Sequence, residues 1–404
     1  MDPHIVCVGG EDHKLRVPFL LALRRRGYRV TAVSTGDGAA FDAAGIAHES
    51  YRFNRFSSGG SDWGAIRAFG KQIAGLKADI VQSFDTKPNL LVPLATRGNT
   101  AVVRTINGLG WVFSSTEPRA LAIRPAFCAL QWLAARWTSA TVFQNREDQA
   151  FFSKWHLLGS SKSQLIGSSG VDSDAFVAAQ KSGPSRDRLR AQLGLTGAEI
   201  IIYVGRLTRQ KGIPTLLKAL PKILAARPSA RLVLVGPLES EGPFAIDPQS
   251  ISGLSPHVMA LGQRSDVSSL LAIADVFAFP TEYREGIPRV LLEAGLSGLP
   301  IVASRMPGCS DVVTDGRNGY LVEPRKPDAF AEKIIALLGN PEEARAMGAR
   351  SVPLVRQRFD LAKVTDAYCG LYNSILEANR GTQRGMDLMP LSRRVLADPG
   401  SLPQ

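Results

Sequence analysis

Residues 277–304 read "FAFPTEYREGIPRVLLEAGLSGLPIVAS". The stretch opens on an apolar run, passes through a polar loop, continues as an amphipathic run and ends on a second apolar run. Short apolar runs bounded by Gly and Pro are typical of buried strands, and the amphipathic run between them is typical of a helix. Two strands joined through a helix lie parallel in one sheet. The stretch therefore predicts a β/α unit of a parallel sheet.

The same alternation recurs along the chain in two series, and a polar stretch rich in Gly, Ser and Pro separates them at 176–199. A chain of 404 residues exceeds the roughly 100–200 residues of one domain. We therefore expect an α/β fold with two doubly wound parallel sheets facing a cleft, and a C-terminal helix that crosses back to the first domain. The predicted parts are a first domain 1–180, a second domain 181–359, a helix 360–380 and a loosely attached tail 381–404.

Composition narrows the class of protein. The net charge is +12, and residues 1–170 hold 20 Lys and Arg against 12 Asp and Glu. An anionic lipid surface or a phosphate-bearing substrate fits this excess, whereas no nucleic-acid-binding motif is present. The four cysteines lack metal or disulfide spacing, and the N-terminus lacks the pattern of a signal peptide. We expect a reduced, cytoplasmic protein without a membrane span.

Two carboxylates mark the opening stretch as a candidate site. Glu285 precedes the predicted helix, and Glu293 lies eight positions later. A helix would hold them about 12 Å apart along its axis, whereas the paired carboxylates of glycosidases stand roughly 5–9.5 Å apart. Two acceptors that bind different hydroxyl groups of one extended ligand fit the spacing better. Two solvated glutamates on a surface helix are the alternative.

Anion-binding features surround these glutamates. Gly286 allows close approach of a ligand, Pro288 suits the first helical turn, and the amides of 286–290 would face the cleft at the positive end of a helix. Arg206 and Lys211 follow the first strand of the second domain. Two cations there would stabilise the charge that develops on a diphosphate leaving group. A solvated basic loop is the alternative.

A third loop follows the strand that ends at Gly262. Gln263 and Arg264 lie between this strand and a helix capped by Ser265 or Asp266. The position suits a slot for a nucleobase, lined by main-chain groups.

Taken together, these motifs resemble glycosyltransferase family 4, retaining enzymes of the GT-B fold. The similarity is greatest over residues 200–325 and extends to the first domain. The sequences of these motifs are similar to those of a bacterial subgroup that builds capsules, exopolysaccharides and lipid-linked oligosaccharides. The matching segments include "VGRLTRQKG" (204–212), "LGQRSDV" (261–267), "YREGIPRVLLEA" (283–294), "DGRNGYLVEP" (315–324), "TINGLGWVFSS" (105–115) and "VFQNREDQAFF" (142–152).

The resemblance implies a role for each matching residue. Arg206 and Lys211 would hold the donor diphosphate, Glu285 would contact the donor sugar, and Glu293 would bind the ribose. Main-chain groups of Gly9 or Gly10 would complete the pocket. The donor-binding set implied in this way is Gly9, Gly10, Arg206, Lys211, Gln263, Arg264, Glu285, Gly286, Ile287, Pro288, Arg289, Val290 and Glu293.

The implied reaction is transfer of a sugar, with an N-acetylated hexose as one candidate, from a UDP-linked donor to a polyprenyl-diphosphate-linked or other saccharide. No metal or other cofactor is expected, since no Asp-x-Asp element ends a strand. Many family members carry a histidine near the position of Asn107, and this chain does not. The leaving phosphate would then help to deprotonate the acceptor, with Asn107 as a positioning group.

The segment between 117 and 137 is the candidate acceptor and membrane region. Arginines and tryptophans on one amphipathic segment suit an anionic membrane surface, which predicts peripheral association with the inner face of the plasma membrane. A helix packed on the sheet with a few exposed arginines is the alternative. The residues proposed for this surface are Arg119, Arg124, Trp132, Arg136 and Trp137.

Two other functions remain open on the sequence. A nucleotide-sugar epimerase shares the two-domain fold, but it would need acid/base residues near the anomeric carbon and no acceptor groove. A non-catalytic sugar-binding module would not need Arg206, Lys211, Glu285 and Glu293 together. The few histidines and the segment rich in Arg and Trp favour the transferase.

Overall fold

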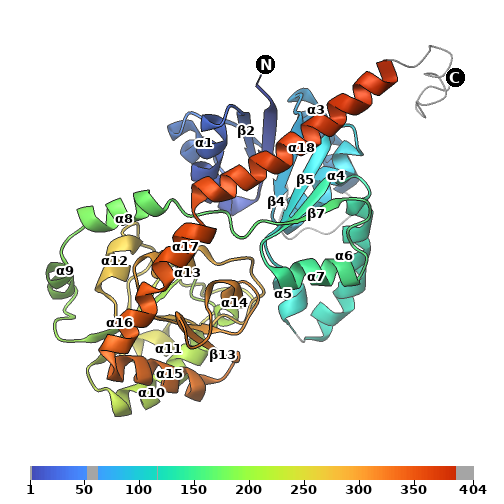
Figure 1. Cartoon of the computed structure of the whole chain (residues 1–404). Coiled ribbons are helices and arrows are strands. Elements are labelled where there is room, and N and C mark those ends of the chain that lie inside the picture. The colour runs from blue at the N-terminus through green and yellow to red at the C-terminus, as the bar shows by residue number, and fades with distance from the viewer. Residues whose placement is uncertain (1, 52–61, 116, 388–404) are drawn as a thin grey trace.

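The computed structural model describes residues 2–51, 62–115 and 117–387. Two α/β lobes lie side by side, and one long helix crosses from the second lobe over the first (Figure 1). Each lobe has its own parallel sheet with helices on both faces. The predicted fold class, two doubly wound domains, is confirmed.

The first sheet has seven strands in the order β3-β2-β1-β4-β5-β6-β7, and its paired strands are parallel. Its central strands are buried on both faces, which explains their continuous apolar runs. The bounds are β1 His4–Val8, β2 Arg29–Ser34, β3 Ala47–Ser50, β4 Ile80–Phe84, β5 Ala101–Ile106, β6 Ala140–Phe143 and β7 Lys162–Leu165.

The second sheet has six strands in the order β10-β9-β8-β11-β12-β13, again parallel. Strands β11 and β12, with the helix between them, are the β/α unit that residues 277–304 predict. The bounds are β8 Glu199–Val204, β9 Ala230–Val235, β10 Val258–Ala260, β11 Val276–Phe279, β12 Ile301–Ser304 and β13 Gly319–Val322.

Helices cover both sheets. In the first lobe they are η1 Glu11–Arg16, α1 Val17–Arg25, α2 Ala39–Ala43, α3 Asp62–Gly75, α4 Thr86–Thr96, α5 Gly110–Ser114, α6 Pro118–Ala135 and α7 Arg146–Lys154. The remaining helices are α8 Ser173–Ser182, α9 Arg186–Gln192, η2 Arg209–Lys211, α10 Ile213–Ala226, α11 Gln249–Ser252, α12 Val267–Ile273, α13 Arg289–Leu296, α14 Cys309–Val312, α15 Pro327–Gly339, α16 Pro341–Ala349, α17 Ser351–Arg358 and α18 Leu361–Asp387.

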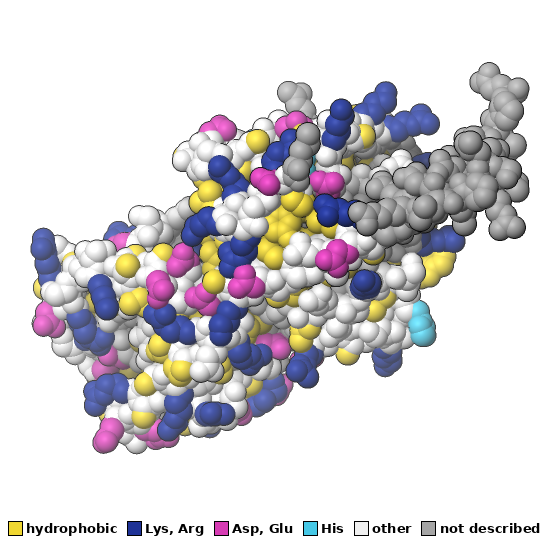
Figure 2. All heavy atoms as spheres, turned by 45° about the horizontal axis from the view of Figure 1, so that its top comes forward, with side chains coloured by type: hydrophobic (Ala, Val, Ile, Leu, Met, Phe, Trp, Pro, Cys, Tyr) yellow, Lys and Arg dark blue, Asp and Glu magenta, His cyan; other side chains and the backbone are white. Residues whose placement is uncertain are grey.

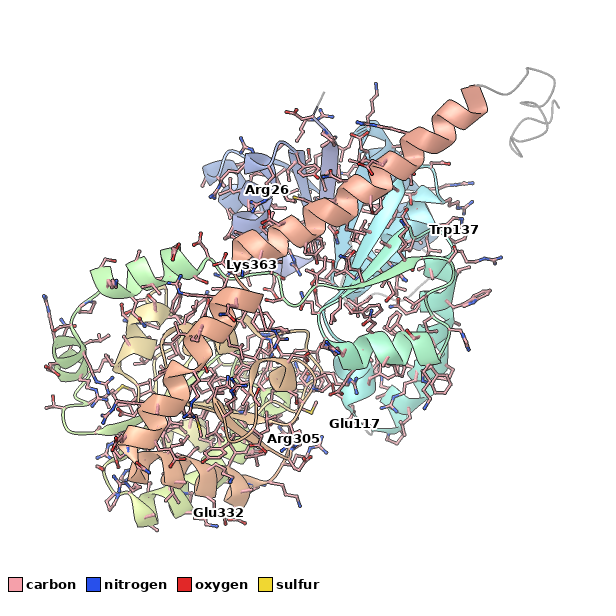
Figure 3. All side chains as sticks on the ribbon, viewed as in Figure 1. Arg26, Glu117, Trp137, Arg305, Glu332 and Lys363 are labelled. Atoms are coloured by element: carbon pink, nitrogen blue, oxygen red, sulfur yellow. The ribbon has the colours of Figure 1, made fainter. Side chains whose placement is uncertain are left out.

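Helix α18 crosses back to the first lobe, as predicted. Its Tyr368 and Tyr372 are buried in the core of that lobe and hydrogen-bond to Thr105 and Gln82. Figure 3 labels Arg26, which follows α1 directly, and Lys363 at the start of α18, where Arg26 Nε also lies 2.6 Å from Asp366.

This helix is longer than predicted, because it continues from residue 380 to Asp387. The first seven residues of the predicted tail are therefore helical, and 388–404 lie outside the described residues.

Two further differences from the predictions have a common cause. The polar stretch 176–199 is not a bare linker, since it includes most of α8 and all of α9, and both pack on α12 of the second lobe. Strands β3 and β7 were not predicted, because their sequences, "AHES" and "KSQL", are not apolar runs. All four segments lie at the edge or surface of a layer, where burial does not require apolar side chains.

Within the described ranges, no helix is both long and apolar enough to cross a bilayer. Lys and Arg side chains are spread over the face seen in Figure 2, with Asp and Glu between them. The net positive charge is thus not gathered in one place on this face.

Candidate functional site

The carboxyl ends of the two sheets face each other across a cavity of about 980 Å³. The loops after β1, β4 and β5 line it from the first lobe, and the loops after β8 and β11 line it from the second. Ligands of doubly wound folds bind at this end of the strands. Of the predicted site residues, the lining contains Gly10, Asn107, Arg206, Lys211, Glu285, Gly286, Ile287, Pro288 and Arg289.

Lys211 and Glu285 meet in this wall. Thr208 caps the turn that presents Lys211, accepting a 3.3 Å bond from its amide. The Lys211 ammonium then lies 2.6 Å from Glu285 Oε1, and Thr281 donates to the same oxygen at 3.2 Å. Only 12 % and 18 % of the two charged side chains are exposed. The structure therefore brings together the two charged groups that the sequence proposes for one ligand.

Arg206 lines the cavity at the end of β8. The Tyr203 hydroxyl donates to the Arg206 carbonyl at 3.0 Å, which holds the loop against the sheet. The guanidinium lies 3.2 Å from Glu239, and 42 % of the Arg206 side chain is exposed, so a ligand can contact it. Sequence reasoning did not identify Glu239, because it follows another strand with no motif around it.

The loop before α13 differs from its predicted form. Pro288 is the residue that precedes the helix, and α13 begins at Arg289. The Gly286 amide donates to the Asn107 carbonyl at 2.9 Å, and the Ile287 amide donates to Gln144 Oε1 at 3.1 Å. These two amides therefore join the lobes and do not face a ligand, which corrects the prediction. The amides of Arg289 and Val290 stand in the first turn of α13, where N–H groups have no intrahelical acceptor.

Asp85 occupies the opposite wall, and sequence reasoning missed it as a site residue. It follows β4 with φ +69° and accepts from the Gly10 amide (2.9 Å), Arg16 (3.0 Å) and Asn107 Nδ2 (3.2 Å). Burial opposes ionisation, but the Arg16 charge and the Gly10 amide outweigh it and lower the pKa of Asp85. The signal that could have found it is a carboxylate directly after a buried strand.

Asn107 is held by this carboxylate. Its amide nitrogen donates to Asp85, and its Oδ1 is buried without a hydrogen-bond partner in the described structure. Asn107 itself lines the cavity, so the predicted positioning group lies in its wall with one unpartnered acceptor oxygen.

The two lobes are joined directly behind the cavity. Arg284 Nη2 lies 3.0 Å from Asp148 of α7, whose side chain is fully buried. The Gly110 amide donates to the Arg284 carbonyl at 3.1 Å, and the Arg284 amide donates to the Ser114 hydroxyl at 2.7 Å. A Cβ on Gly108 would collide with Arg284 and Glu285, so only glycine allows this approach. The loop that carries Glu285 is therefore positioned by both lobes.

Two family models match this chain. "Glycosyl transferases group 1" matches residues 185–351, and "Glycosyltransferase Family 4" matches residues 19–157. Residues from both matches line the cavity, and the two matches together span most of the chain. The chain belongs to these glycosyltransferases.

Similar proteins include bacterial enzymes of glycan assembly. The UDP-Gal:alpha-D-GlcNAc-diphosphoundecaprenol alpha-1,3-galactosyltransferase of Escherichia coli is 28 % identical over 73 % of this chain and 75 % of its own. The N,N'-diacetylbacillosaminyl-diphospho-undecaprenol alpha-1,3-N-acetylgalactosaminyltransferase of Campylobacter jejuni is 24 % identical over 91 % of this chain and 97 % of its own. The match to Spore coat protein SA of Bacillus subtilis, 29 % identical, covers 46 % of this chain and 52 % of that relative. The chain thus spans only about half the length of some relatives.

Solved structures share the fold. Anabaena Alr3699/HepE in complex with UDP and glucose superposes with a TM-score of 0.74 at 21 % identity, over 92 % of this chain and 100 % of that one. WaaG, a glycosyltransferase involved in lipopolysaccharide biosynthesis, superposes with a TM-score of 0.70 at 18 % identity, over 91 % and 99 %. At these identities the likeness establishes the GT-B architecture of the glycosyltransferase.

Glu293 of this glycosyltransferase lies behind the cavity lining. Arg289, which does line the cavity, holds Glu293 Oε1 at 2.9 Å, and only 17 % of the Glu293 side chain is exposed. Burial raises the pKa of Glu293 more than Arg289 lowers it. The fully solvated alternative is thereby wrong for Glu293, and its ribose contact stays a prediction.

Besides Glu293, four predicted donor residues lie outside the lining. Gln263 and Arg264 are exposed, and Arg264 pairs with Asp266 through two contacts of 2.7 and 2.8 Å. Val290 packs against the core of the second lobe. Gly9 supports the wall from behind, because a Cβ there would overlap the His13 ring. The nucleobase slot stays a prediction.

Helix α6 carries the predicted acceptor surface, and Figure 3 labels residues beside its two ends, Glu117 and Trp137. Arg119 and Arg136 are exposed, and Arg136 lies over the Trp132 ring at 5.1 Å. Arg124 instead donates to the Val112 and Ser115 carbonyls at 2.9 and 2.8 Å. These bonds anchor α5 to α6, so Arg124 is structural.

Trp137 also differs from the prediction, since it is half-buried against Gly98. Three exposed apolar residues of α6 were not among the predicted acceptor residues. They are Leu121 (46 % exposed), Ile123 (39 %) and Leu130 (44 %), beside Trp132 (48 %). The buried positions of this helix are Ala120, Gln131, Ala134 and Ala135. Four large apolar side chains of this helix are thus exposed, whereas its buried positions are mostly alanine.

Proposed function

We propose that this glycosyltransferase transfers a sugar from a nucleotide diphosphate donor, UDP-linked, to a polyprenyl-diphosphate-linked saccharide with retention of configuration. The observation that carries the proposal is the arrangement across the cavity. Lys211, Arg206 and Glu285 stand on one wall, and Asp85 and Asn107 stand on the other. A donor held by the first group would present its anomeric carbon to an acceptor held by the second.

The donor side supplies charge stabilisation. As the bond between the anomeric carbon and the diphosphate oxygen breaks, negative charge grows on the leaving group. Lys211 and Arg206 both line the cavity from the second lobe. The Glu285 carboxylate holds the Lys211 ammonium in place and accepts hydrogen bonds from sugar hydroxyls. Cationic donors fixed before the reaction need little reorganisation during it.

The acceptor side positions a hydroxyl group. The acceptor oxygen forms the new bond to the anomeric carbon on the face from which the diphosphate leaves, and its proton passes to an oxygen of that diphosphate. Asn107 Oδ1 accepts a hydrogen bond from the acceptor saccharide, and Asp85 fixes the Asn107 side chain. No side-chain base takes part in this scheme.

The lipid-linked acceptor would be met at a membrane surface. Leu121, Ile123, Leu130 and Trp132 are exposed on α6, and Arg119 and Arg136 are exposed near its two ends. A helix with exposed apolar side chains and exposed arginines suits the boundary between headgroups and acyl chains of an anionic bilayer. The names of the Escherichia coli and Campylobacter relatives, both of which refer to diphosphoundecaprenol acceptors, support this choice.

We further propose that catalysis needs no metal ion. Among residues 2–51, 62–115 and 117–387, no group of three or more His, Cys, Asp or Glu side chains is placed to hold one. Turnover unchanged by a chelator would support this part, and loss of turnover that Mg²⁺ restores would overturn it.

The test is nucleotide release with defined substrates. The enzyme is incubated with UDP- and GDP-sugars, with and without a polyprenyl-diphosphate-linked N-acetylhexosamine. Release that requires the acceptor, with an α-linked product by NMR, supports the proposal. Interconversion of the nucleotide sugar without an acceptor would favour the epimerase. Binding of nucleotide sugars without any turnover would favour a sugar-binding module.

A further inference from the structure

A buried arginine stands behind the wall of the cavity on the acceptor side. Arg104 of β5 is fully buried and donates through Nη1 to Gln131 Oε1 at 3.0 Å and through Nη2 to Thr141 Oγ1 at 3.2 Å. Its Nε is buried without a partner. No carboxylate of the described residues pairs with this guanidinium, which is rare for a buried charge.

Arg104 decides how Gln131 is oriented. A guanidinium has donors only, so the side-chain oxygen of Gln131 must face Arg104. The NH2 group of Gln131 then points the other way. Gln131 lines the cavity, and no acceptor among the described residues bonds to its NH2 group. The wall therefore presents two N–H donors, held by a cation behind them.

The charge behind Gln131 selects the kind of ligand. A guanidinium at low dielectric polarises the amide that it bonds and makes the far side a stronger donor. Burial lowers the pKa of Arg104 to about 9, so the group remains cationic at neutral pH. An anionic oxygen at the Gln131 NH2 group would gain from both the hydrogen bond and the positive potential.

Helix α6, which carries Gln131, also carries exposed apolar side chains. Phe127 and Gln131, one helical turn apart, line the cavity. Leu130 and Trp132, the neighbours of Gln131 in sequence, are exposed and lie outside the cavity lining. The helix that carries Gln131 in the cavity wall thus also carries exposed apolar side chains that a lipid chain can contact from outside the cavity.

We infer that Gln131, oriented by Arg104, binds a phosphate oxygen of the diphosphate in the lipid-linked acceptor. This inference rests on the proposed function, because it takes the acceptor class from it. Gln131 would touch the acceptor directly, and Arg104 would be a positioning residue. The diphosphate would then fix how far the acceptor saccharide reaches toward Asn107.

Binding of short lipid probes separates this site from the donor site. Farnesyl diphosphate and farnesol are titrated calorimetrically in the presence of saturating UDP or GDP, which fills the donor site. The proteins compared are the wild type, Gln131→Met and the matched control Gln149→Met. Gln149 lies on α7 outside the cavity lining and donates to Ser163 at 2.9 Å.

We expect Gln131→Met to weaken farnesyl diphosphate binding about tenfold and to leave farnesol binding unchanged, because only the charged probe uses the donors. Gln149→Met should change neither. Arg104→Met should give the same selective loss, and Arg104→Lys should restore part of it. Thermal unfolding checks that each variant folds. If Arg104→Met does not fold, the result for Gln131→Met alone tests the inference.

Equal affinity of wild type and Gln131→Met for farnesyl diphosphate would overturn the inference, as would an equal loss for both probes. The binding assay does not depend on turnover. A selective loss without any sugar transfer would therefore reject the proposed function and keep the anion site, whereas transfer without a selective loss would do the reverse.

Discussion

Lys211 Nζ lies 2.6 Å from Glu285 Oε1, although the two residues are 74 positions apart in the chain. Each charged group needs the other, because an unpaired charge in such a buried position is strongly unfavourable. A ligand that binds Lys211 through phosphate therefore also changes the environment of Glu285. The two motifs of the second domain act as one unit.

Replacing Lys211 by Met should lower kcat about 100-fold or more, because a preorganised cation facing developing charge is lost. Glu285→Ala should likewise impair turnover more than donor binding. The double variant should lose less than the product of the two single losses, since the groups act together. Steady-state kinetics measures all three variants. Lys222→Met is the control, because Lys222 forms a surface pair with Glu332 at 2.7 Å. If the losses of the two single variants multiply in the double variant, Lys211 and Glu285 act independently and the prediction is wrong.

Glu293→Ala should mainly weaken donor binding, with KM for the nucleotide sugar raised about tenfold and kcat largely kept. The side chain is nearly buried and paired with Arg289, which lines the cavity, and the predicted partner of Glu293 is a ribose hydroxyl of the donor. KM and kcat measured separately test this. The exposed Glu342, in the first turn of α16, supplies a control substitution. A loss confined to kcat would argue against a ribose contact.

Asn107→Ala should lower turnover and weaken acceptor binding, because the unpartnered Oδ1 disappears from the cavity wall. Asp85→Asn should have a smaller effect of the same kind, since an amide can still accept a bond from Asn107. Acceptor titrations at saturating donor measure both. Full turnover of Asn107→Ala at unchanged acceptor affinity would remove Asn107 from the mechanism.

Trp132→Ser and Leu130→Ser should each reduce binding to vesicles that contain anionic phosphatidylglycerol, by about tenfold, because each removes a large exposed apolar side chain. Leu238→Ser is the matched control, since Leu238 is 37 % exposed on the second lobe. Co-sedimentation measures the bound fraction. Equal binding of all variants would show that α6 does not contact the bilayer.

Acidification should destabilise the first lobe through His13. Burial lowers the pKa of His13 to about 3, so the folded state keeps this ring neutral, whereas the unfolded chain takes up a proton below its ordinary pKa of 6.5. The contribution of His13 is therefore present above pH 6.5 and decreases as pH falls below it, by about 1.4 kcal/mol per pH unit.

Urea unfolding at pH 7.5 and 5.5 measures this slope. His13→Asn should reduce the difference between the two pH values. Replacement of the exposed His156 by Gln should leave it as in the wild type. If His13→Asn shows the full wild-type difference, another group is responsible.

The sequence by itself determined the parts of the molecule that depend on local pattern. Apolar runs such as 200–205 and 300–304 can be buried only as central strands, so the two parallel sheets follow from them. Arg206, Lys211 and Glu285 all follow such strands. Because ligands of doubly wound folds bind at the carboxyl ends of strands, this position alone predicts that the three residues line one cavity.

Only the tertiary structure decided which groups contact each other. The Gly286 and Ile287 amides were predicted to face a ligand, but they bond to the first lobe, which pattern along one chain segment cannot reveal. Asp85 has no motif of its own, and it becomes part of the site because Gly10, Arg16 and Asn107 converge on it. The exposure of the apolar side chains of α6 likewise depends on which side of the helix the rest of the lobe covers. Hydrogen bonds and burial between distant segments are set by packing, and packing is a property of the folded chain.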